Sequence, residues 1–323
     1  MFGISRRDFV LSAAGAYAAF GLDKPIAFIG TAEAQGAAPG FRKYKVGDIE
    51  VISIYDGLWE KPHDENFVKG ATVDQTKAAL KAAGLTDAFV PIPFTTLVLK
   101  TRGGLVLIDS GTGGGQAGGP KAGLWAQNFA AAGLDPKAVK TIIISHFHGD
   151  HIFGLMAKDT NAPTFPEAEI IVPAAELKWW TQPIDSIPQP RQANAKRVQA
   201  TFPSWKNIKV VEGEAELVPG VRAIPTFGHT QGHTSHIISS RGKELIASAD
   251  ITNIQALFVK NPDWQPIFDH VPDLAIETRK KVFQRAIADK AMIAGYHWGL
   301  PNVGTIHKDG NGYVFTPAAG NGA

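Results

Sequence analysis

The sequence contains no cysteine among its 323 residues. This absence excludes disulfides, thiol nucleophiles and thiolate metal sites, so any metal must be held by histidine, aspartate or glutamate. The chain also has little net charge, because 32 lysines and arginines nearly balance 30 aspartates and glutamates. The basic residues are scattered, and without a basic face the sequence gives no support for a nucleic-acid partner. What it does have, 44% hydrophobic and 19% charged residues, is typical of a globular protein.

The sequence also lacks an apolar run long enough to span a membrane. The apolar stretch over residues 9–22 stops at Asp23-Lys24, short of the roughly 20 residues that a span needs. Arg6-Arg7 precedes this stretch, and an Ala-Glu-Ala sequence at 32–34 follows it. This order is typical of a cleaved twin-arginine export signal. The alternatives are an amphipathic first helix or a membrane anchor. We therefore predict a signal peptide over 1–34, a periplasmic protein and no stable membrane anchor.

The remaining chain, 35–323, mixes strands with separated helices. Short β-prone runs at 43–46 and 49–55, and again at 95–100 and 105–108, flank glycine-containing turns and predict hairpins. Further strands are predicted at 141–144, 169–172, 208–211, 221–224, 236–239, 244–249, 304–308 and 313–316, and helices at 124–132 and 275–290. No linker or low-complexity tract divides these segments. The simplest architecture is one domain of two packed sheets flanked by helices.

Four residues of metal-binding types follow the apolar strand predicted at 141–144. They are His146, His148, Asp150 and His151. In an extended segment His146 and His148 point the same way, so both can reach one ion, and the following turn can bring Asp150 and His151 to a second ion. The alternative is a loop of surface histidines. The density of imidazole and carboxylate at the end of a buried strand favours a metal site.

This motif, H-x-H-x-D-H with Gly154 three residues further on, resembles the metallo-β-lactamase superfamily of hydrolases. The resemblance implies an α/β fold, an αββα sandwich of two mixed β-sheets flanked by helices. Within the superfamily the sequence looks most similar to the exported methyl parathion hydrolase and lactonase-arylesterase group. The segments that carry this second likeness are 47–51, 131–136, 217–220 and 310–313.

The resemblance extends to the rest of a binuclear site. His229 lies in a segment similar to the family's G-H-T-x-G-H, Asp250 follows a second apolar strand, and His297 follows the long predicted helix. The resemblance implies that His146, His148 and His229 hold one ion, that Asp150, His151 and His297 hold the other, and that Asp250 bridges the two. Imidazole with carboxylate favours two zinc ions, while manganese, iron and cobalt stay open.

Supporting roles are expected for several further residues. Asp109 ends the strand at 105–108, where it either orients a ligating histidine or simply caps a turn. His233 matches a family position that packs or orients rather than binds metal. The tryptophans Trp179, Trp180 and Trp298 either line a pocket for a flat apolar substrate or belong to the core.

The implied chemistry is hydrolysis by a hydroxide that bridges two metals, with Asp150 and Asp250 as catalytic carboxylates. We expect a lactone, an aryl ester or a related ester as the small-molecule substrate. Phosphotriester cleavage is expected to be weak, since the glycine-rich loop 113–119 has no aromatic residue. A tyrosine-assisted lactonase mechanism is not expected, since Asn253 stands where some lactonases carry tyrosine. The alternatives are an organophosphate triester hydrolase, a glyoxalase-II-like thioesterase, a β-lactamase and a non-catalytic periplasmic metal-binding protein. A homodimer stays open.

Overall fold

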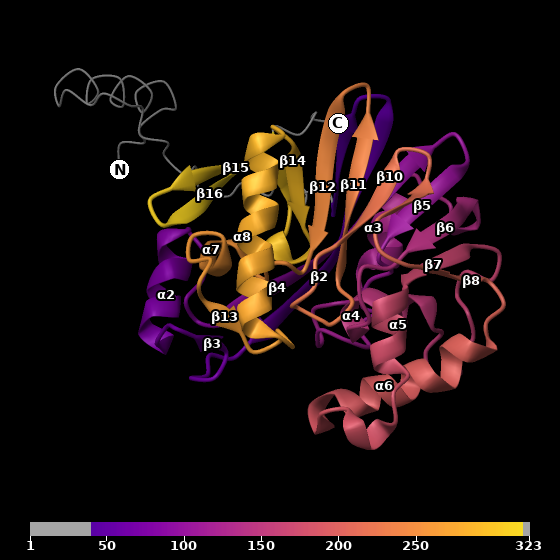
Figure 1. The fold of residues 1–323 in the computed structure, drawn as a ribbon, viewed down its shortest axis with the longest axis horizontal. Coiled ribbons are helices and arrows are strands. Elements are labelled where there is room, and N and C mark those ends of the chain that lie inside the picture. Colours follow the sequence, from indigo (N-terminus) through magenta and orange to yellow (C-terminus); the bar gives the residue numbers. More distant parts are fainter. Residues whose placement is uncertain (1–39, 319–323) are drawn as a thin grey trace, which may run out of the picture. The chain divides into compact units, whose positions relative to one another are not determined.

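The computed structural model describes residues 40–318, so the predicted export signal and its cleavage site lie outside the described residues. Two seven-stranded sheets form the centre of this part (Figure 1). Among these residues, no helix has both the length and the hydropathy needed to cross a membrane.

The first sheet is mixed. Its antiparallel half is followed by a parallel half in which β5 to β8 run the same way. In spatial order its strands are β1 (Phe41–Val46), β2 (Ile49–Lys61), β4 (Val90–Thr101), β5 (Gly104–Ile108), β6 (Val139–Ile143), β7 (Glu169–Pro173) and β8 (Ile208–Val211).

The second sheet is mixed as well, with one parallel pair, β12 and β14, among antiparallel neighbours. In spatial order its strands are β16 (Gly312–Pro317), β15 (Val303–Asp309), β14 (Met292–Gly295), β12 (Lys243–Ala249), β11 (Thr234–Ser240), β10 (Val221–Pro225) and β9 (Ala215–Val218). A small separate pair consists of β3 (Val68–Lys69) and β13 (Gln265–Pro266).

Helices cover the outer faces of both sheets. Helices α3, α5 and α6 pack on the first sheet and α8 on the second (Figure 1). The helices are α2 (Val73–Ala82), α3 (Trp125–Ala131), α4 (Gly149–Ile152), α5 (Ala174–Trp180), α6 (Gln189–Thr201), α7 (Gln255–Phe258) and α8 (Pro272–Ala288), with 3₁₀ turns η1 (Pro136–Ala138), η2 (Phe153–Leu155), η3 (Ile184–Ser186), η4 (Phe202–Ser204) and η5 (Tyr296–Trp298).

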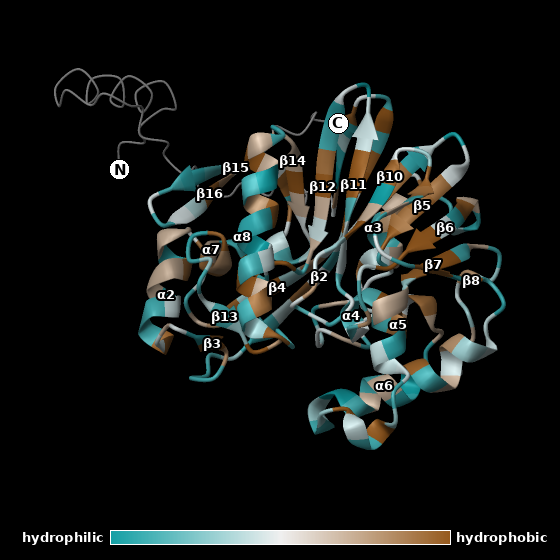
Figure 2. Cartoon of the chain, in the orientation of Figure 1, coloured by the Kyte–Doolittle hydropathy of each residue, from teal (hydrophilic) through white to brown (hydrophobic). Residues whose placement is uncertain are grey.

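The alternation of side chains along the strands produces the layers. In β6, Ile143 points between the sheets, where it joins a cluster with Val221 and Ala247 of the second sheet. Its neighbour Ile142 points the other way and packs with Val198 of α6. Because the strand buries both faces it is apolar throughout, as the brown strands β5, β6 and β7 of Figure 2 show. The αββα sandwich implied by the resemblance is confirmed.

The predicted elements are found, with one informative extension. The predicted strand 95–100 is the second half of the longer β4, which begins at Val90 and contains Pro91 and Pro93. Strand β5 pairs only with Leu97 to Thr101 of β4. At the two prolines, β4 therefore pairs with β2 on one side and with no strand of residues 40–318 on the other. A strand tolerates proline, which lacks an N–H, on such an unpaired side.

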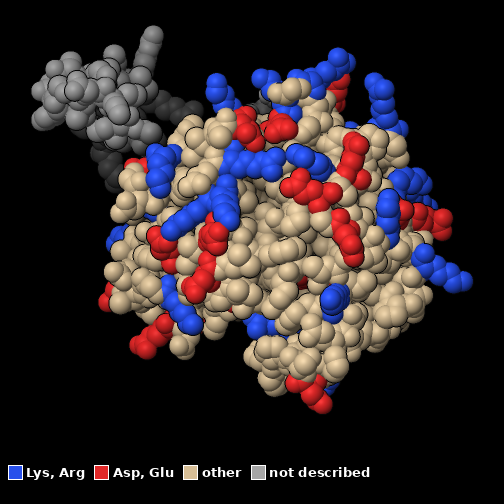
Figure 3. Space-filling model, in the orientation of Figure 1, with Lys and Arg blue, Asp and Glu red and all other residues tan. Residues whose placement is uncertain are grey.

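The charged residues form no single-sign region on the face shown in Figure 3, where lysine and arginine side chains lie among aspartate and glutamate. This mixed surface agrees with the near-zero net charge of the sequence.

Candidate metal centre

The predicted site residues come together at one edge of the sandwich. His146 follows β6, Asp250 follows β12 directly, and His297 lies in η5 just after β14. Strand β5 runs parallel to β6, and β12 runs parallel to β14. Parallel strands end at the same edge of a sheet, and such edges are where α/β proteins place their binding sites. The two sheets thus deliver side chains from residues more than a hundred positions apart to a common point.

The donor atoms fall into three converging groups. The first consists of His146, His148 and His229, the second of His146, His151 and Asp250, and the third of Asp150, His151 and His297. Within each group the donor atoms all lie within 4.8 Å of one another. The structure thus brings together all seven of the residues named from the sequence. The first and third groups have the members of the two ligand sets that the resemblance implies, and the second places Asp250 beside a histidine of each set.

The distances show which atoms face the common centre. Nδ1 of His148 lies 3.0 Å from Nε2 of His146 and 3.0 Å from Nε2 of His229. Asp250 reaches both halves of the cluster, with Oδ1 3.3 Å from Nε2 of His151 and Oδ2 3.4 Å from Nε2 of His229. This double reach is the geometry that a bridging carboxylate requires.

Within residues 40–318, two of these atoms have no hydrogen-bond partner although they are buried. They are Nε2 of His151 and Oδ1 of Asp250, which face each other. Buried polar atoms are nearly always satisfied, and an exception calls for an ion or another missing partner. A cation between the two atoms would satisfy both, so the residues present fit a bound metal.

The pKa shifts reflect the same surroundings. Burial, followed by the neighbouring imidazoles, lowers the pKa of His146 and of His148 well below the usual value. Burial would also lower the pKa of His151, but the carboxylates of Asp250, Asp150 and Asp109 raise it well above the usual value. The neutral imidazole is the form of histidine that binds metal. The three carboxylates that favour a proton on His151 would also favour a metal cation beside it.

Carboxylates outside the cluster fix the orientation of two rings. Oδ2 of Asp109 lies 2.8 Å from Nδ1 of His151, and the same carboxylate accepts the backbone N–H of Ser145. Oδ1 of Asp269 lies 2.9 Å from Nδ1 of His229. Each contact leaves Nε2 of the ring free for the centre. Asp109 was singled out from the sequence, whereas Asp269 was missed, because it lies in an irregular loop with no motif around it.

The chain also matches a family model. The model of the metallo-β-lactamase superfamily matches residues 91–293, which is more than half of the chain. The chain belongs to the metallo-β-lactamase superfamily. Six of the seven candidate ligands lie within the matched residues, and the seventh, His297, lies four positions after the end of the match.

Curated relatives point to one group of this superfamily. The chain is 28% identical over 163 residues to an N-acyl homoserine lactonase of Bacillus cereus, and 29% identical over 163 residues to one of Bacillus thuringiensis. These matches cover 50% of this chain and 56% of each relative. The chain thus spans about half the length of the curated relatives it matches.

Solved structures extend the likeness to most of the chain. AidC, a dizinc quorum-quenching lactonase solved with the product N-hexnoyl-L-homoserine, has a TM-score of 0.80 at 25% identity, over 87% of this chain and 98% of that chain. The hydrolase AbOPH has a TM-score of 0.79 at 24% identity, over the same shares of the two chains. The second likeness shows the fold alone.

A pocket of about 350 Å³ opens over the candidate metal centre of this superfamily member. Its lining combines the cluster residues His148, Asp150, His229, Asp250 and His297 with the aromatic side chains Trp59, Phe94, Phe153, Trp180 and Phe268. Of the three tryptophans considered from the sequence, Trp180 lines the pocket. Trp298 instead packs in the core beside Phe315, which is the alternative that the sequence left open.

The aromatic wall of the pocket bears on the expectation of weak phosphotriester cleavage. Loop 113–119 itself has no aromatic residue, but Phe94 lies directly beneath Gly118, whose added Cβ would fall 2.4 Å from the Phe94 ring. Both line the pocket. The pocket therefore has an aromatic wall although the loop has no aromatic residue, because β2, β4 and the loop after β13 supply the aromatic side chains.

Glu176 joins the two histidine-bearing segments and was also missed from the sequence. Its carboxylate accepts the backbone N–H of Phe147 at 2.9 Å, the hydroxyl of Thr230 at 2.7 Å and the backbone N–H of Gly232 at 2.9 Å. Burial raises the pKa of Glu176. Gly232 leaves room for this contact, since a Cβ there would lie 2.0 Å from the backbone of Glu176.

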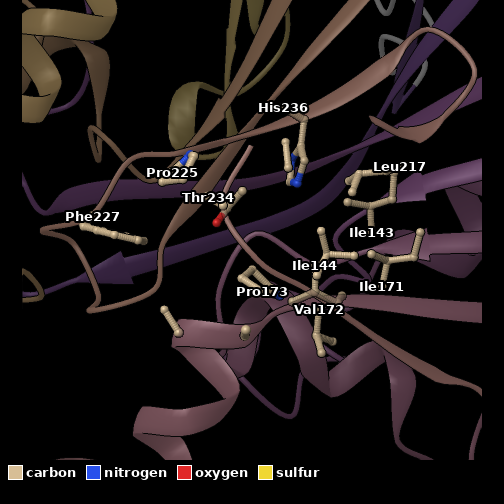
Figure 4. A pocket seen from close by; sticks show the side chains of 15 residues that line it. Ile143, Ile144, Ile171, Val172, Pro173, Leu217, Pro225, Phe227, Thr234 and His236 are labelled. Carbon is tan, nitrogen blue, oxygen red and sulfur yellow. The ribbon is translucent and has the colours of Figure 1, made fainter. Parts of the chain in front are cut away.

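Two further buried histidines, His233 and His236, do not join the donor groups. Nε2 of His233 accepts the backbone N–H of Asp250 at 3.1 Å, which makes His233 a support for the turn after β12. His236 points into a small cavity of about 30 Å³ between the sheets, among aliphatic side chains such as Ile143 and Leu217 (Figure 4).

Proposed function

We propose that the protein is a binuclear metal-dependent hydrolase that opens lactones and cleaves related esters. The observation that carries the proposal is the set of three donor groups at the base of a pocket with aromatic walls. The curated relatives, which are N-acyl homoserine lactonases, and the likeness to a dizinc lactonase support the choice of a lactone.

The donor groups assign the residues. His146, His148 and His229 would hold one ion and Asp150, His151 and His297 the second, with Asp250 between them. Seven donors exceed what one tetrahedral ion needs, which supports two ions. The mixture of imidazole and carboxylate suits zinc. When bound, such a metal pair polarises the carbonyl of the substrate and lowers the pKa of water.

The two carboxylates differ in their surroundings and so in their roles. Asp250 is 4% exposed and touches histidines of both halves, so it holds the cluster together. Asp150 is 19% exposed and faces the pocket, with Oδ2 3.5 Å from Nε2 of both His151 and His297. The hydroxyl of Tyr296 donates to the backbone carbonyl of Asp150 and fixes this residue. Asp150 is therefore placed to take the proton of an attacking water and to pass it to the leaving oxygen.

Phosphotriester hydrolysis is the second candidate. The aromatic side chains Trp59, Phe94 and Phe268 around the pocket favour a flat aryl leaving group, which both aryl esters and aryl phosphotriesters carry. Pocket shape selects between them, since a polarised C=O and a polarised P=O accept the same nucleophile.

A substrate panel tests the proposal. Purified protein saturated with zinc is assayed with an N-acyl homoserine lactone, dihydrocoumarin, phenyl acetate, paraoxon, nitrocefin and a glutathione thioester. We expect the highest kcat/KM for a lactone, a metal content of two ions per chain, and loss of both in Asp250→Ala. If kcat/KM is highest for paraoxon, nitrocefin or the thioester, the substrate class is that of the preferred compound and not a lactone. Metal-loaded protein that turns over none of the compounds would favour a non-catalytic metal-binding protein.

We also propose that the protein works in the periplasm after export by the twin-arginine route. This route carries folded proteins, which suits a chain that must collect metal before it crosses the membrane. Changing Arg6 and Arg7 together to lysine should leave the protein, uncleaved, in the cytoplasmic fraction. Unchanged periplasmic protein in a cell fractionation would contradict the proposal.

A further inference from the structure

His148 differs from the other candidate ligands in what holds its second ring nitrogen. Its Nδ1 faces the centre, 3.0 Å from Nε2 of both His146 and His229. Its Nε2 points away and lies 3.3 Å from Nε2 of His270. For His151, His229 and His297 the outward nitrogen meets an oxygen atom instead, from Asp109, Asp269 and the backbone of Pro93.

The donors and acceptors allow one arrangement of protons along this contact. A ligand that binds metal through Nδ1 must carry its proton on Nε2, so His148 donates from Nε2. His270 must then accept at Nε2 and carry its own proton on Nδ1. That nitrogen lies 2.6 Å from Oε1 of Gln231, which is an acceptor. The chain of contacts therefore runs from Gln231 through His270 to His148 without conflict.

The surroundings of His270 hold its ring in place. Its backbone N–H donates to the carbonyl of His229 at 2.9 Å. The ring of Trp179 lies 4.7 Å from that of His270 and the ring of Trp180 lies 6.0 Å from it. Trp179, which does not line the pocket, thus packs against the residue that contacts His148.

We propose that His270, with its tautomer fixed by Gln231, is the positioning residue that directs Nδ1 of His148 to the metal. The inference rests on the proposed metal centre and adds two residues that no motif of the sequence marked. Gln231 lies two residues after His229, and His270, in the loop after β13, is joined to His229 by a backbone hydrogen bond, so the surroundings of one candidate ligand support a second.

The decisive variants keep or remove the acceptor at the position of Nε2. In His270→Gln the side-chain Oε1 can take that position, whereas His270→Leu fills similar space without an acceptor. We expect zinc affinity of the site that contains His148 to fall about 10- to 100-fold in His270→Leu, and to stay within about threefold of the wild type in His270→Gln. Gln231→Leu should weaken binding in the same direction, and Gln231→Glu, which keeps the acceptor, should not.

Zinc affinity is measured by competition with a chromophoric chelator, and the unfolding free energy of the metal-free proteins is measured in urea. His307→Leu, a change at an exposed histidine, is the control. Wild-type affinity in His270→Leu would overturn the role of His270. Equal losses in His270→Gln and His270→Leu would overturn it as well, because the ring rather than the acceptor would then matter. A wild-type protein that binds no zinc would instead overturn the proposed metal centre itself.

Discussion

At the scale of single residues, the pocket contains one charged group without a counter-charge. The guanidinium of Arg191 lines the pocket, and burial lowers its pKa with no carboxylate of residues 40–318 to offset the effect. A guanidinium carries five donors. Because it lines the same pocket as the candidate ligands, Arg191 is suited to contact the part of a substrate that does not react.

We therefore expect Arg191→Met to affect substrates unequally. For a lactone that carries an amide acceptor, kcat/KM should fall about tenfold or more, since a hydrogen bond to a charged group contributes roughly 1.5 to 3 kcal/mol. For a plain lactone without the amide it should change little. Lys196→Met removes an exposed charge from the same helix and serves as the control. Equal losses on both lactones would show that Arg191 is not a substrate contact.

Sequence reasoning found the candidate metal ligands and one supporting carboxylate, Asp109, but it missed the supporting residues Asp269 and Glu176. Four of the candidate ligands follow one apolar strand within six positions, so the sequence alone indicates metal binding; they are His146, His148, Asp150 and His151. Asp269 and Glu176 are single acids separated from the ligands by tens of residues. Their roles depend on loops that meet only in the folded chain, and nothing local in the sequence marks that meeting.

At the scale of elements, the turn after β12 is strained where it presents Asp250. Ala249 has a φ of 45°, a left-handed conformation that residues with a Cβ rarely adopt. Strand β12 pairs regularly with β14 up to Ala247, and the pairing shifts at Ala249. The hydrogen bond from the Asp250 N–H to His233 helps to hold the turn. Strain of this kind persists only where the surrounding structure imposes it.

Replacing Ala249 by glycine should therefore stabilise the protein. We expect the unfolding free energy to rise by about 1 kcal/mol, because glycine adopts this conformation without the cost that a Cβ brings. Ala247→Gly, in the regular part of the same strand, should lower it by about 1 kcal/mol. Urea unfolding of the metal-free proteins measures both changes. A loss of stability in Ala249→Gly as large as that in Ala247→Gly would exclude strain at this turn.

The elements were predictable to different degrees. Strands such as β6 bury both faces and read as apolar runs, and α8 repeats its apolar residues at helical intervals. Helix α6 was not predicted, because its thirteen residues are mostly polar and only Ala195, Val198 and Thr201 are buried. It nevertheless supplies Arg191 and Asn194 to the pocket. A polar helix that covers a binding site gives little periodic signal in the sequence.

At the scale of the whole molecule, the imidazole of His236 is buried in the space between the two sheets. His236 is 1% exposed, and its Nδ1 has no hydrogen-bond partner in the described chain. Burial lowers its pKa from 6.5 to about 4, while the negative charge of Asp109 opposes the shift. The sandwich thus keeps His236 neutral under conditions in which an exposed histidine is charged.

This burial should make the stability of the sandwich depend on pH. Between about pH 6.5 and 4 the unfolded chain binds a proton at this position while the folded protein does not, so stability falls as the pH falls through that window. The loss of unfolding free energy amounts to about 3 kcal/mol at most.

In His236→Leu the position cannot be protonated. The unfolding free energy of this variant relative to wild type should therefore rise as the pH falls, and should be constant above about pH 7. Urea unfolding of both proteins from pH 7.5 to 4.5 gives the difference, in which the other titrating groups cancel. His307→Leu, at an exposed position, should show no such change, and a pH-independent difference for His236→Leu would mean that folding does not shift the pKa of His236.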